Sequence, residues 1–320
     1  MKIVVGDIGG THARFALAEL GGGGRPRLGP LRKYRTREHA GLEAAWARFE
    51  REAGEPLPKA AALAVAAPIE GEVLRFLNSD WRIPRATIAA ELGLERLLLL
   101  NDFGAVAHAV SALAPDELAP IAGPPALQPE GVVSVIGPGT GLGVAILSRR
   151  AGRVTVIETE AAHIAFAPLD PEEEALADTL IARYGRASVE RVVSGPGLID
   201  VYLHLGGETE LAPARAGELW SAAIDGSDAL AAHGLDILVR CFGAAAGDIS
   251  LAHGAMGVAI TGGLANRIAH LLRSPAFEAR FTAKGRYRDR MQRVPVVLAT
   301  YAEPGLLGAA IAFERETEGG

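Results

Sequence analysis

Short apolar runs separated by glycine-rich turns dominate the start of the chain. An apolar run over residues 2–8 predicts a buried strand, and a second apolar run over residues 13–20 has the alternation of a strand. Because only a short glycine-containing turn separates the two runs, they predict a hairpin. The following stretch, GGGGRPRLGP at residues 21–30, predicts a flexible turn.

Helical and strand patterns then alternate. Apolar residues recur at helical spacing over residues 42–49, and strands are expected at residues 61–67 and 72–78, around a turn at residues 68–71. Proline is favoured in the first turn of a helix, so Pro84 predicts the start of a helix that ends near Gly93.

A leucine run at residues 97–100 stops at Asn101 and Asp102, and alanine-rich helical sequence follows. This pattern is typical of a buried parallel strand. Open α/β sheets usually place their chemistry at the carboxyl ends of such strands. Asp102 is therefore a candidate reactive carboxylate, and capping of the following helix is an alternative role that is compatible with reactivity.

The second half of the chain repeats the plan of the first. Residues 132–136 and 144–147 predict two strands around a glycine loop at residues 137–143, which indicates a weak internal duplication. The remaining elements expected from the pattern are helices at residues 171–184 and 227–253, a strand at residues 258–261 that leads through residues 262–264 into another helix, a strand at residues 296–299, and a last helix from Leu306 after a break at Pro304 and Gly305.

Composition excludes several classes of protein. The chain has 320 residues, of which 49% are hydrophobic and 22% are charged, as in an ordinary globular protein and unlike disordered or fibrous chains. This length suits two lobes. The net charge is −6 and the 32 basic residues are scattered, which argues against a nucleic-acid partner.

Other sequence features favour a cytoplasmic protein. Cys241 is the single cysteine, so an intramolecular disulfide or a zinc cluster is excluded, and its apolar helical surroundings predict a core residue. The beginning of the chain, MKIVVGD, lacks the features of a signal peptide. We expect no run to be long enough to cross a bilayer, and therefore no membrane partner.

The two glycine loops, at residues 9–11 and 139–141, have competing interpretations. A Walker loop needs a lysine after its last glycine, and a dinucleotide fingerprint needs a helix after the glycines, whereas each loop here precedes a strand. Two tight turns that need glycine for positive φ are the plain alternative. The occurrence of a pair favours backbone N–H groups that bind a polyphosphate. Gly262 and Gly263 add a third place where a nucleotide could approach the backbone.

Asp7 lies on the first predicted strand, where a carboxylate is costly unless a hydrogen bond or a cation satisfies it. One interpretation is an aspartate that caps the turn. The other, which we favour, is a group that Mg²⁺ reaches through water, because Mg²⁺ keeps much of its hydration shell.

Seven stretches stand in order along nearly the whole chain: GDIGGTHAR, LLNDFGAVAHAV, GPGTGLGVA, ETEAAHIAFAP, SVERVVSGPGL, ITGGLANRI and PGLLGAA. Together they resemble the motif series of the bacterial glucokinase family, within the actin-like and hexokinase-like ATPase superfamily. The resemblance implies an α/β, two-lobed actin-like/ribonuclease H-like ATPase fold with a duplicated mixed-sheet core and a cleft between the lobes. It also implies a small domain of residues 1–110, to which the C-terminal helix at residues 301–320 returns, and a large domain of residues 111–300.

The resemblance implies an enzyme that transfers the γ-phosphoryl group of ATP to the 6-hydroxyl of glucose, with Mg²⁺, as a cytoplasmic homodimer. Asp102 matches the family's catalytic base. The sugar-binding positions are matched by Asn101, Asp102, Glu160, His163 and Glu190. We assign nucleotide binding to Gly6, Asp7, Ile8, Gly9, Gly10, Thr11, Gly139, Thr140, Gly141, Gly262 and Gly263, with Asp7 also expected at the metal.

Taken without the family, the acids have plainer interpretations. Glu160 and His163 could form a solvated pair, Glu190 could be an exposed helical acid, and the acids at residues 172–174 suit the dipole of a helix's first turn. The motif order favours sugar binding for the first three. The run at residues 172–174 keeps its plain interpretation.

The chain departs from the family pattern near the predicted sugar site. Ala161 and Ala162 stand where the family usually has two glycines, Ala165 stands where an aspartate is common, and His12 replaces the usual asparagine. These differences leave open a kinase of another hexose or of an N-acetylated amino sugar. A sugar-sensing regulator without catalysis and an actin-like filament or chaperone ATPase remain minor alternatives.

Overall fold

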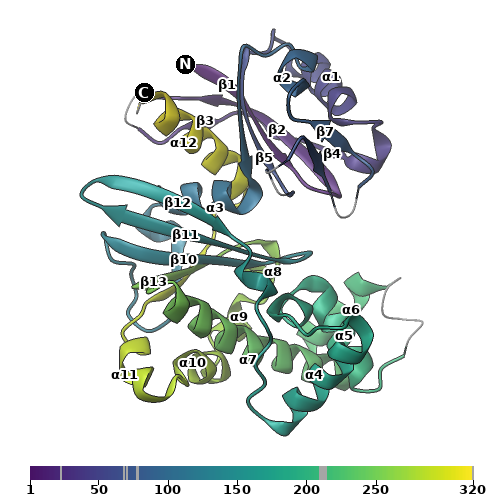
Figure 1. The fold of residues 1–320 in the computed structure, drawn as a ribbon, viewed down its shortest axis with the longest axis vertical. Coiled ribbons are helices and arrows are strands. Elements are labelled where there is room, and N and C mark those ends of the chain that lie inside the picture. Colours follow the sequence, from purple (N-terminus) through teal and green to yellow (C-terminus); the bar gives the residue numbers. More distant parts are fainter. Residues whose placement is uncertain (22–23, 68, 70, 77–78, 209–214, 319–320) are drawn as a thin grey trace. The chain divides into compact units, whose positions relative to one another are not determined.

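The computed structural model describes the chain except for residues 22–23, 68, 70, 77–78, 209–214 and 319–320 (Figure 1). The chain divides into two compact units. Unit 1 consists of Met1–Leu113, Val156–Glu158 and Tyr301–Gly320, and unit 2 consists of Ala114–Thr155 and Thr159–Thr300. Each unit is built on its own six-stranded sheet.

The sheet of unit 1 has the order β3-β2-β1-β5-β8, and β4 also pairs with β2. Its strands are β1 (Lys2–Ile8), β2 (His12–Glu19), β3 (Arg27–Leu28), β4 (Arg32–Arg35), β5 (Ala60–Val65) and β8 (Arg96–Asn101). The hairpin of β1 and β2 is confirmed as antiparallel, and β5 runs parallel to both β1 and β8. The leucine run therefore forms the expected parallel strand, which ends at Asn101.

Helices cover both faces of this sheet. The helices of unit 1 are α1 (Leu42–Ala53), α2 (Ile88–Glu91), α3 (Asp102–Val110) and α12 (Pro304–Glu318), with the 3-10 turn η1 (Thr36–Glu38). On one face, Phe15 stacks on Phe49 of α1 and meets Trp46 edge to face. On the other face, Phe313 of α12 belongs to the cluster that contains Ile3 of β1. Packing on both faces of the sheet thus fixes the positions of β1 and β8.

Unit 2 has a sheet of order β12-β11-β10-β13-β14-β9. Its strands are β9 (Leu118–Ala122), β10 (Gly131–Pro138), β11 (Leu142–Arg150), β12 (Arg153–Thr159), β13 (Gly257–Ile260) and β14 (Val296–Ala299). The hairpin of β10 and β11 is antiparallel, whereas β13 runs parallel to both β10 and β14. An antiparallel hairpin followed by two parallel strands occurs in both units, and this shared order supports the duplication.

Unit 2 also contains helices and short 3-10 turns. They are η2 (Pro115–Glu117), η3 (Ala161–His163), α4 (Pro171–Tyr184), η4 (Val189–Arg191), α5 (Gly195–His204), α6 (Ala216–Asp225), α7 (Ala229–Ala252), α8 (Gly263–Arg267), α9 (Ala269–Leu272), α10 (Pro275–Thr282), η5 (Gly285–Tyr287) and α11 (Arg288–Met291). The helix α7 is long and apolar enough to span a membrane, so the expectation that no run approaches that length is wrong. Because 67% of its apolar window is buried, α7 has the character of a core helix, and Cys241 lies buried on it as predicted.

Three local expectations differ from the structure. Pro84 ends strand β7 (Arg82–Pro84), which pairs with β6 (Val73–Arg75), and the helix α2 begins only at Ile88. The stretch at residues 21–30, of which residues 22–23 lie outside the described part, contains β3. Finally, the last helix begins at Pro304, whereas the sequence predicted a break at Pro304 and Gly305 before a helix from Leu306. Proline is suitable at this position because the N–H that it lacks would have no partner in the first turn of a helix.

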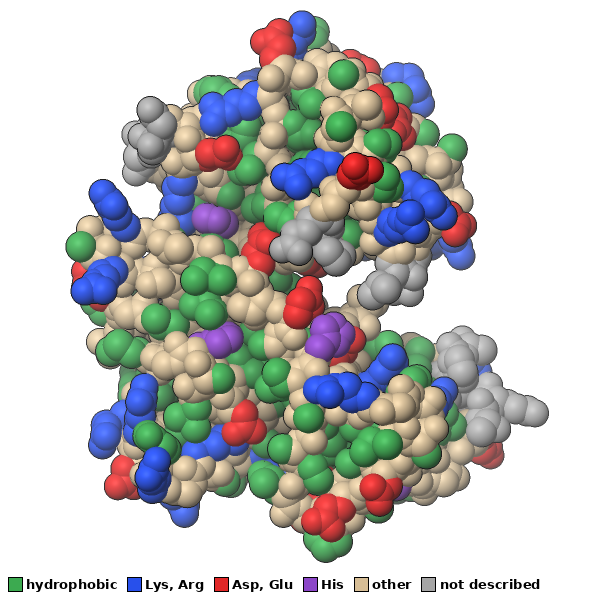
Figure 2. Space-filling view, viewed as in Figure 1, with side chains coloured by type: hydrophobic (Ala, Val, Ile, Leu, Met, Phe, Trp, Pro, Cys, Tyr) green, Lys and Arg blue, Asp and Glu red, His purple; other side chains and the backbone are tan. Residues whose placement is uncertain are grey.

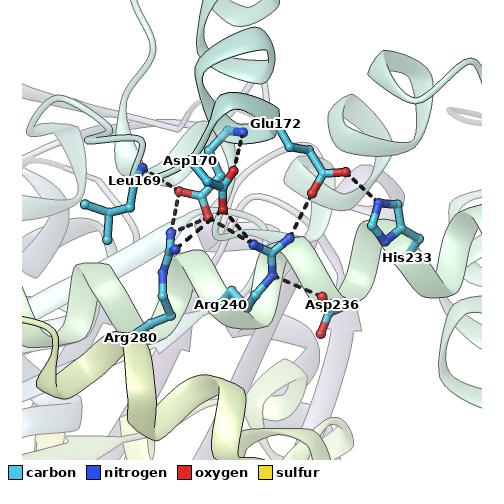
Figure 3. Close-up of polar contacts among 8 residues, drawn as sticks. Leu169, Asp170, Glu172, His233, Asp236, Arg240 and Arg280 are labelled. Carbon is cyan, nitrogen blue, oxygen red and sulfur yellow. Dashed lines mark hydrogen bonds and ion pairs between the residues drawn. The ribbon is translucent and has the colours of Figure 1, made fainter.

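A buried ion-pair network joins α4, α7 and α10 in unit 2 (Figure 3). Glu173 is fully buried, and its carboxylate accepts hydrogen bonds from Arg280 and from the backbone N–H of Leu169. Arg240 lies 3.5 Å from Glu173 and also binds Asp170 at 3.0 Å. Glu173 lies in the first turn of α4, as the helix-dipole interpretation predicts, but the sequence did not indicate its burial or its ion pairs. Its charge is matched by two guanidinium groups from distant segments.

Charged side chains of both signs are interspersed over the surface seen in Figure 2. This distribution fits the scattered basic residues of the sequence and its net charge of −6.

Candidate functional site

The junction of β8 and α3 presents the two polar residues that end the leucine run. Asn101 is the N-cap of α3, and its Oδ1 accepts hydrogen bonds from the N–H groups of Phe103 at 2.8 Å and Gly104 at 3.2 Å. The first N–H groups of a helix lack intrahelical partners, which explains why an asparagine is suitable here. The cap fixes the direction in which Asp102 leaves the sheet.

Asp102 is the first residue of α3, and its Oδ1 accepts a hydrogen bond from the N–H of Phe103 at 2.9 Å. Burial raises the pKa of the Asp102 carboxyl from its ordinary value of 3.8 to about 7, and the negative charges of Asp7 and Glu158 add to this shift. The hydrogen bond from the N–H of Phe103 lowers the pKa of Asp102, but by less than burial raises it. Asp102 can therefore exchange a proton near neutral pH.

Glu158 is a member of this group of acids that the sequence did not indicate. Its Oε1 accepts a hydrogen bond from the N–H of Asn101 at 3.1 Å. A Cβ added to Gly104 would lie 2.2 Å from the same oxygen, so a glycine in the first turn of α3 allows this close approach. Glu158 thus supports the junction from outside the β8–α3 segment.

Asp7 lies on β1 opposite Arg14 of β2, and Arg14 donates a hydrogen bond of 2.8 Å to its Oδ2. Burial raises the pKa of Asp7, while the charge and the hydrogen bond of Arg14 lower it. The first turn of α12 is close, because a Cβ on Gly305 would lie 3.2 Å from Asp7 Cγ. The partner of Asp7 is therefore a guanidinium, and the side chain stays 21% exposed.

The turn between β1 and β2 is held by hydrogen bonds of its own backbone. The N–H of Gly9 donates to the carbonyl of His12 at 2.9 Å. Thr36 ties the turn to η1, because its Oγ1 donates to the carbonyl of Gly10 at 2.6 Å and its N–H to the carbonyl of Thr11 at 3.1 Å. The turn is thereby fixed in shape, as a backbone anion site requires. Gly6 and Ile8 lie on β1 directly before it.

The glycine loop of unit 2 is supported from two sides. The N–H of Gly139 donates to the carbonyl of Gly141 at 2.7 Å, and the carbonyl of Gly139 accepts from the N–H of Gly195 at the start of α5, also at 2.7 Å. Glu190 accepts a hydrogen bond from the N–H of Leu142 at 2.9 Å. The loop that carries Thr140 is thus held by α5 and by η4.

The interpretation that these glycines are needed for positive φ is wrong for Gly9, Gly139 and Gly141, since none of the three lies in the left-handed region. Space is the reason at Gly141, where a Cβ would lie 2.4 Å from Glu190 Oε2. Gly262 does have a positive φ, of 99°, which favours glycine. A Cβ at this position would lie 3.3 Å from the carbonyl oxygen of Pro138. Gly262 and Gly263, at the start of α8, therefore border the strand that leads into the glycine loop.

The candidate sugar residues of unit 2 lie on two short segments that pair with each other. The N–H of Val189 donates to the carbonyl of Ile164 at 3.0 Å, which joins η4 to the residues after η3. Glu160 and His163 lie 3.6 Å apart and are exposed, at 74% and 57% of their side-chain areas. Glu190 is only partly exposed and supports the glycine loop, so it is not the exposed helical acid of the plain interpretation.

The two alanines that replace the family's glycines are built into the core of unit 2. Ala162 is 2% exposed within the main apolar cluster, and Ala161 packs against the same cluster. Their methyl groups therefore stiffen the segment that presents Glu160 and His163. Ala165 forms an isolated bridge with Ser188 on the other segment.

The structure thus gathers the predicted residues into two sets. One set, in unit 1, contains Asp7, the turn after it, Asn101 and Asp102. The other, in unit 2, contains the glycine loop with Glu190 and Gly262, and the neighbouring exposed pair Glu160 and His163. Within the described ranges, no group of three or more histidine, cysteine, aspartate or glutamate side chains could hold a metal ion.

Comparison with known proteins gives one family. The family model described as Glucokinase matches residues 4–316. The glucokinase of Zymomonas mobilis is 47% identical over 316 residues, which cover 98% of this chain and 98% of that protein. The crystal structure of a glucokinase from an Antarctic psychrotroph superposes with a TM-score of 0.82 at 29% identity, covering 97% of this chain and 98% of that one. A ROK family glucokinase from Streptomyces griseus, in complex with glucose and AMPPNP, shares the fold, with a TM-score of 0.65, 20% identity and coverage of 97% and 98%.

Proposed function

Since the chain belongs to the glucokinase family and is an ATP-dependent hexose kinase, we propose that Asp102 is the base that accepts the proton of the glucose 6-hydroxyl. The hydroxyl oxygen attacks the γ-phosphorus of ATP, and its proton passes to the Asp102 carboxylate. The bond between the γ-phosphorus and the bridging oxygen breaks, which releases ADP and leaves glucose 6-phosphate.

The observation that carries the proposal is the environment of Asp102. A general base works best when its pKa lies near the operating pH, and burial beside other acids raises the pKa of Asp102 to about 7. The N-cap at Asn101 fixes the start of α3, so the carboxylate is positioned before the substrate binds. Phosphoryl transfer depends mainly on such positioning and on charge stabilisation.

We assign the sugar hydroxyls to Asn101, Glu160, His163 and Glu190. The Oδ1 of Asn101 already accepts two backbone hydrogen bonds, which leaves its amide NH₂ to donate to a hydroxyl. Glu160 and His163 are exposed and held by a stiff segment. Glu190 uses Oε2 for the N–H of Leu142, and its Oε1 is available to accept from the sugar. Several fixed polar contacts of this kind reject analogues that lack a hydroxyl.

The phosphates of ATP are assigned to the glycine turns. The turn at residues 9–11 and the loop at residues 139–141 are both fixed by backbone hydrogen bonds, so their remaining N–H groups can be directed at phosphate oxygens. Gly262 and Gly263 border the second loop and are assigned to the nucleoside side. AMPPNP in the Streptomyces griseus structure is an ATP analogue, which supports ATP as the donor.

Asp7 fits Mg²⁺ as a single carboxylate that acts together with the phosphates. Mg²⁺ is usually held by one or two carboxylates, substrate phosphates and water, and this site provides one partly exposed carboxylate that Arg14 also contacts. The ion would neutralise charge on the phosphates. Arg14 donates a hydrogen bond to Asp7 Oδ2, and its positive charge opposes the rise in the pKa of Asp7 that burial causes.

We also propose, from the family, a cytoplasmic homodimer. Light scattering on the purified protein tests the dimer, for which about twice the 33.3 kDa mass of one chain is expected.

A coupled assay of ADP release over a panel of hexoses tests the substrate. We expect the highest kcat/KM with glucose, compared with mannose, fructose and N-acetylglucosamine. Ala161 and Ala162 are the reason to include the panel, because the methyl group of Ala162 is buried and that of Ala161 packs against the same apolar cluster, next to Glu160. A higher kcat/KM with N-acetylglucosamine than with glucose would mean that the preferred substrate is an amino sugar.

A further inference from the structure

A hollow of about 670 Å³ in unit 1 borders the glycine turn on the side of η1. Three segments line it: the turn between β1 and β2, the residues from Arg35 to Ala40, and Ser79 to Trp81 just before β7. Its volume lies within the range of about 300–1,000 Å³ that is typical of small-molecule sites. The site residues assigned above account for only one of its three walls.

Hydrogen bonds join the three walls. Thr36 Oγ1 donates to the carbonyl of Gly10 at 2.6 Å, which connects η1 to the turn. Trp81 Nε1 donates to the carbonyl of His39 at 3.1 Å, which connects the third wall to the second. Trp81 is 4% exposed, so the indole is fixed within the hollow's lining. The hollow is therefore a built feature of unit 1.

The charge of the lining favours an anion. Arg35, Arg37, His12 and His39 line the hollow together with one carboxylate, that of Asp80. Arg35 has Glu38 at 3.7 Å. By contrast, no hydrogen-bond or ion-pair partner of Arg37 occurs among the residues that the structure describes.

The charges that act on His12, in the lining of the hollow, are positive with the exception of Glu38. Burial lowers the pKa of His12, and the positive charges of Lys33, Arg14 and Arg35 lower it further. A site where cations already disfavour the protonation of a histidine is one where a negative ligand is stabilised.

We propose that this hollow binds a phosphate dianion, carried by glucose 6-phosphate or by free inorganic phosphate, and that Arg37 is its main ligand. A guanidinium binds phosphate oxygens through two parallel N–H groups, and Arg37 needs to break no existing ion pair to do so. Because Gly10 and Thr11 belong both to the hollow and to the turn assigned to ATP, a bound phosphate opposes nucleotide binding. The choice of glucose 6-phosphate rests on the proposed function, whereas inorganic phosphate does not.

Tryptophan fluorescence of the full chain tests the proposal, since Trp81 lines the hollow. The protein is titrated, without nucleotide, with glucose 6-phosphate and separately with inorganic phosphate. Arg37→Gln should weaken binding of both ligands by about tenfold or more, as expected for the loss of a charge-assisted hydrogen bond. Arg51→Gln is the matched control, because Arg51 is an exposed arginine on α1 that likewise has no partner within the described residues.

Binding in the wild type and in Arg51→Gln, with the loss confined to Arg37→Gln, supports the proposal. Equal affinities for the two ligands mean that the hollow recognises the phosphate group, and tighter binding of glucose 6-phosphate means that it also contacts the sugar. The inorganic phosphate arm stays decisive even if the enzyme does not phosphorylate glucose.

Three results would overturn the proposal. The first is no saturable fluorescence change at millimolar concentrations of either ligand, with calorimetry also negative. The second is an equal loss of affinity in Arg37→Gln and Arg51→Gln. The third is a rise in the KM for ATP in Arg37→Gln that matches the loss of phosphate affinity, which would make the hollow part of the nucleotide site. The proposal instead predicts relief of phosphate inhibition at unchanged kcat.

Discussion

The carboxylates of Glu173 in unit 2, which is fully buried, and Asp102 in unit 1, which is half-buried, differ in the charges that face them. Glu173 is fully buried between Arg280 and Arg240 (Figure 3). Asp102 accepts a hydrogen bond from the N–H of Phe103 and faces the acids Asp7 and Glu158. Burial alone thus does not separate a structural acid from a reactive one. The sign of the neighbouring charges separates them, because Glu173 faces two guanidinium groups, whereas the acids beside Asp102 contribute to raising its pKa to about 7.

The largest effect is expected at Asp102. Asp102→Asn keeps the shape of the side chain but removes the proton acceptor, so kcat should fall by about 10² to 10⁴-fold while glucose still binds. The raised pKa of Asp102 stabilises the fold at acid pH, and this contribution is lost as the pH rises through about 7. At pH 8, the melting temperature of Asp102→Asn should therefore equal or exceed that of the wild type. A kcat near normal would refute the role of Asp102.

Glu173 should show the opposite behaviour. Glu173→Gln leaves Arg280 and Arg240 without their buried partner, and the free energy of unfolding should fall by about 3–5 kcal/mol. Denaturant unfolding at neutral pH measures this change, and kcat of the folded fraction should be unaffected. Glu174→Gln, at the exposed next position of α4, is the control and should change stability by less than about 0.5 kcal/mol. Equal stability of the two variants would mean that the network contributes nothing.

A smaller effect is expected at Glu190, whose carboxylate accepts a hydrogen bond from the backbone N–H of Leu142. Glu190→Gln weakens the hydrogen bond to Leu142 and the contact with the sugar, so the KM for glucose should rise about tenfold and the KM for ATP should rise as well. Glu160→Gln is the comparison. Because Glu160 is exposed, this substitution should raise the KM for glucose and leave the KM for ATP unchanged. If both variants raise only the KM for glucose, Glu190 does not support the nucleotide loop.

Local periodicity was sufficient to predict the elements that present the site. The alternating and apolar runs predicted β1, β2, β8, β10 and β11, because their burial patterns follow from neighbours along the chain. The same periodicity does not predict α5 or α10, and it favours a helix at Pro84, which ends a short strand. The pairing of β7 with β6 decides that conformation, and pairing depends on residues outside any local window.

The charged residues show the same limit. The position of Asp102 at the end of a buried strand was visible in the leucine run. Glu158 was not, because it meets Asn101 from 57 positions away along the chain. Glu173 was assigned to a helix dipole because its partner Arg280 lies 107 positions later. Resemblance to a family supplied the roles of Glu160 and His163, which as isolated residues are an exposed pair.

The pH dependence of kcat/KM for glucose tests the central claim most directly. Because the base must be ionised, kcat/KM should fall about tenfold per pH unit below about 7, where the Asp102 carboxyl takes up its proton. Glu158→Gln removes one of the negative charges that raise this pKa, so the acid limb should move to lower pH by less than one unit. A profile that stays flat down to pH 5 in the wild type would contradict the account.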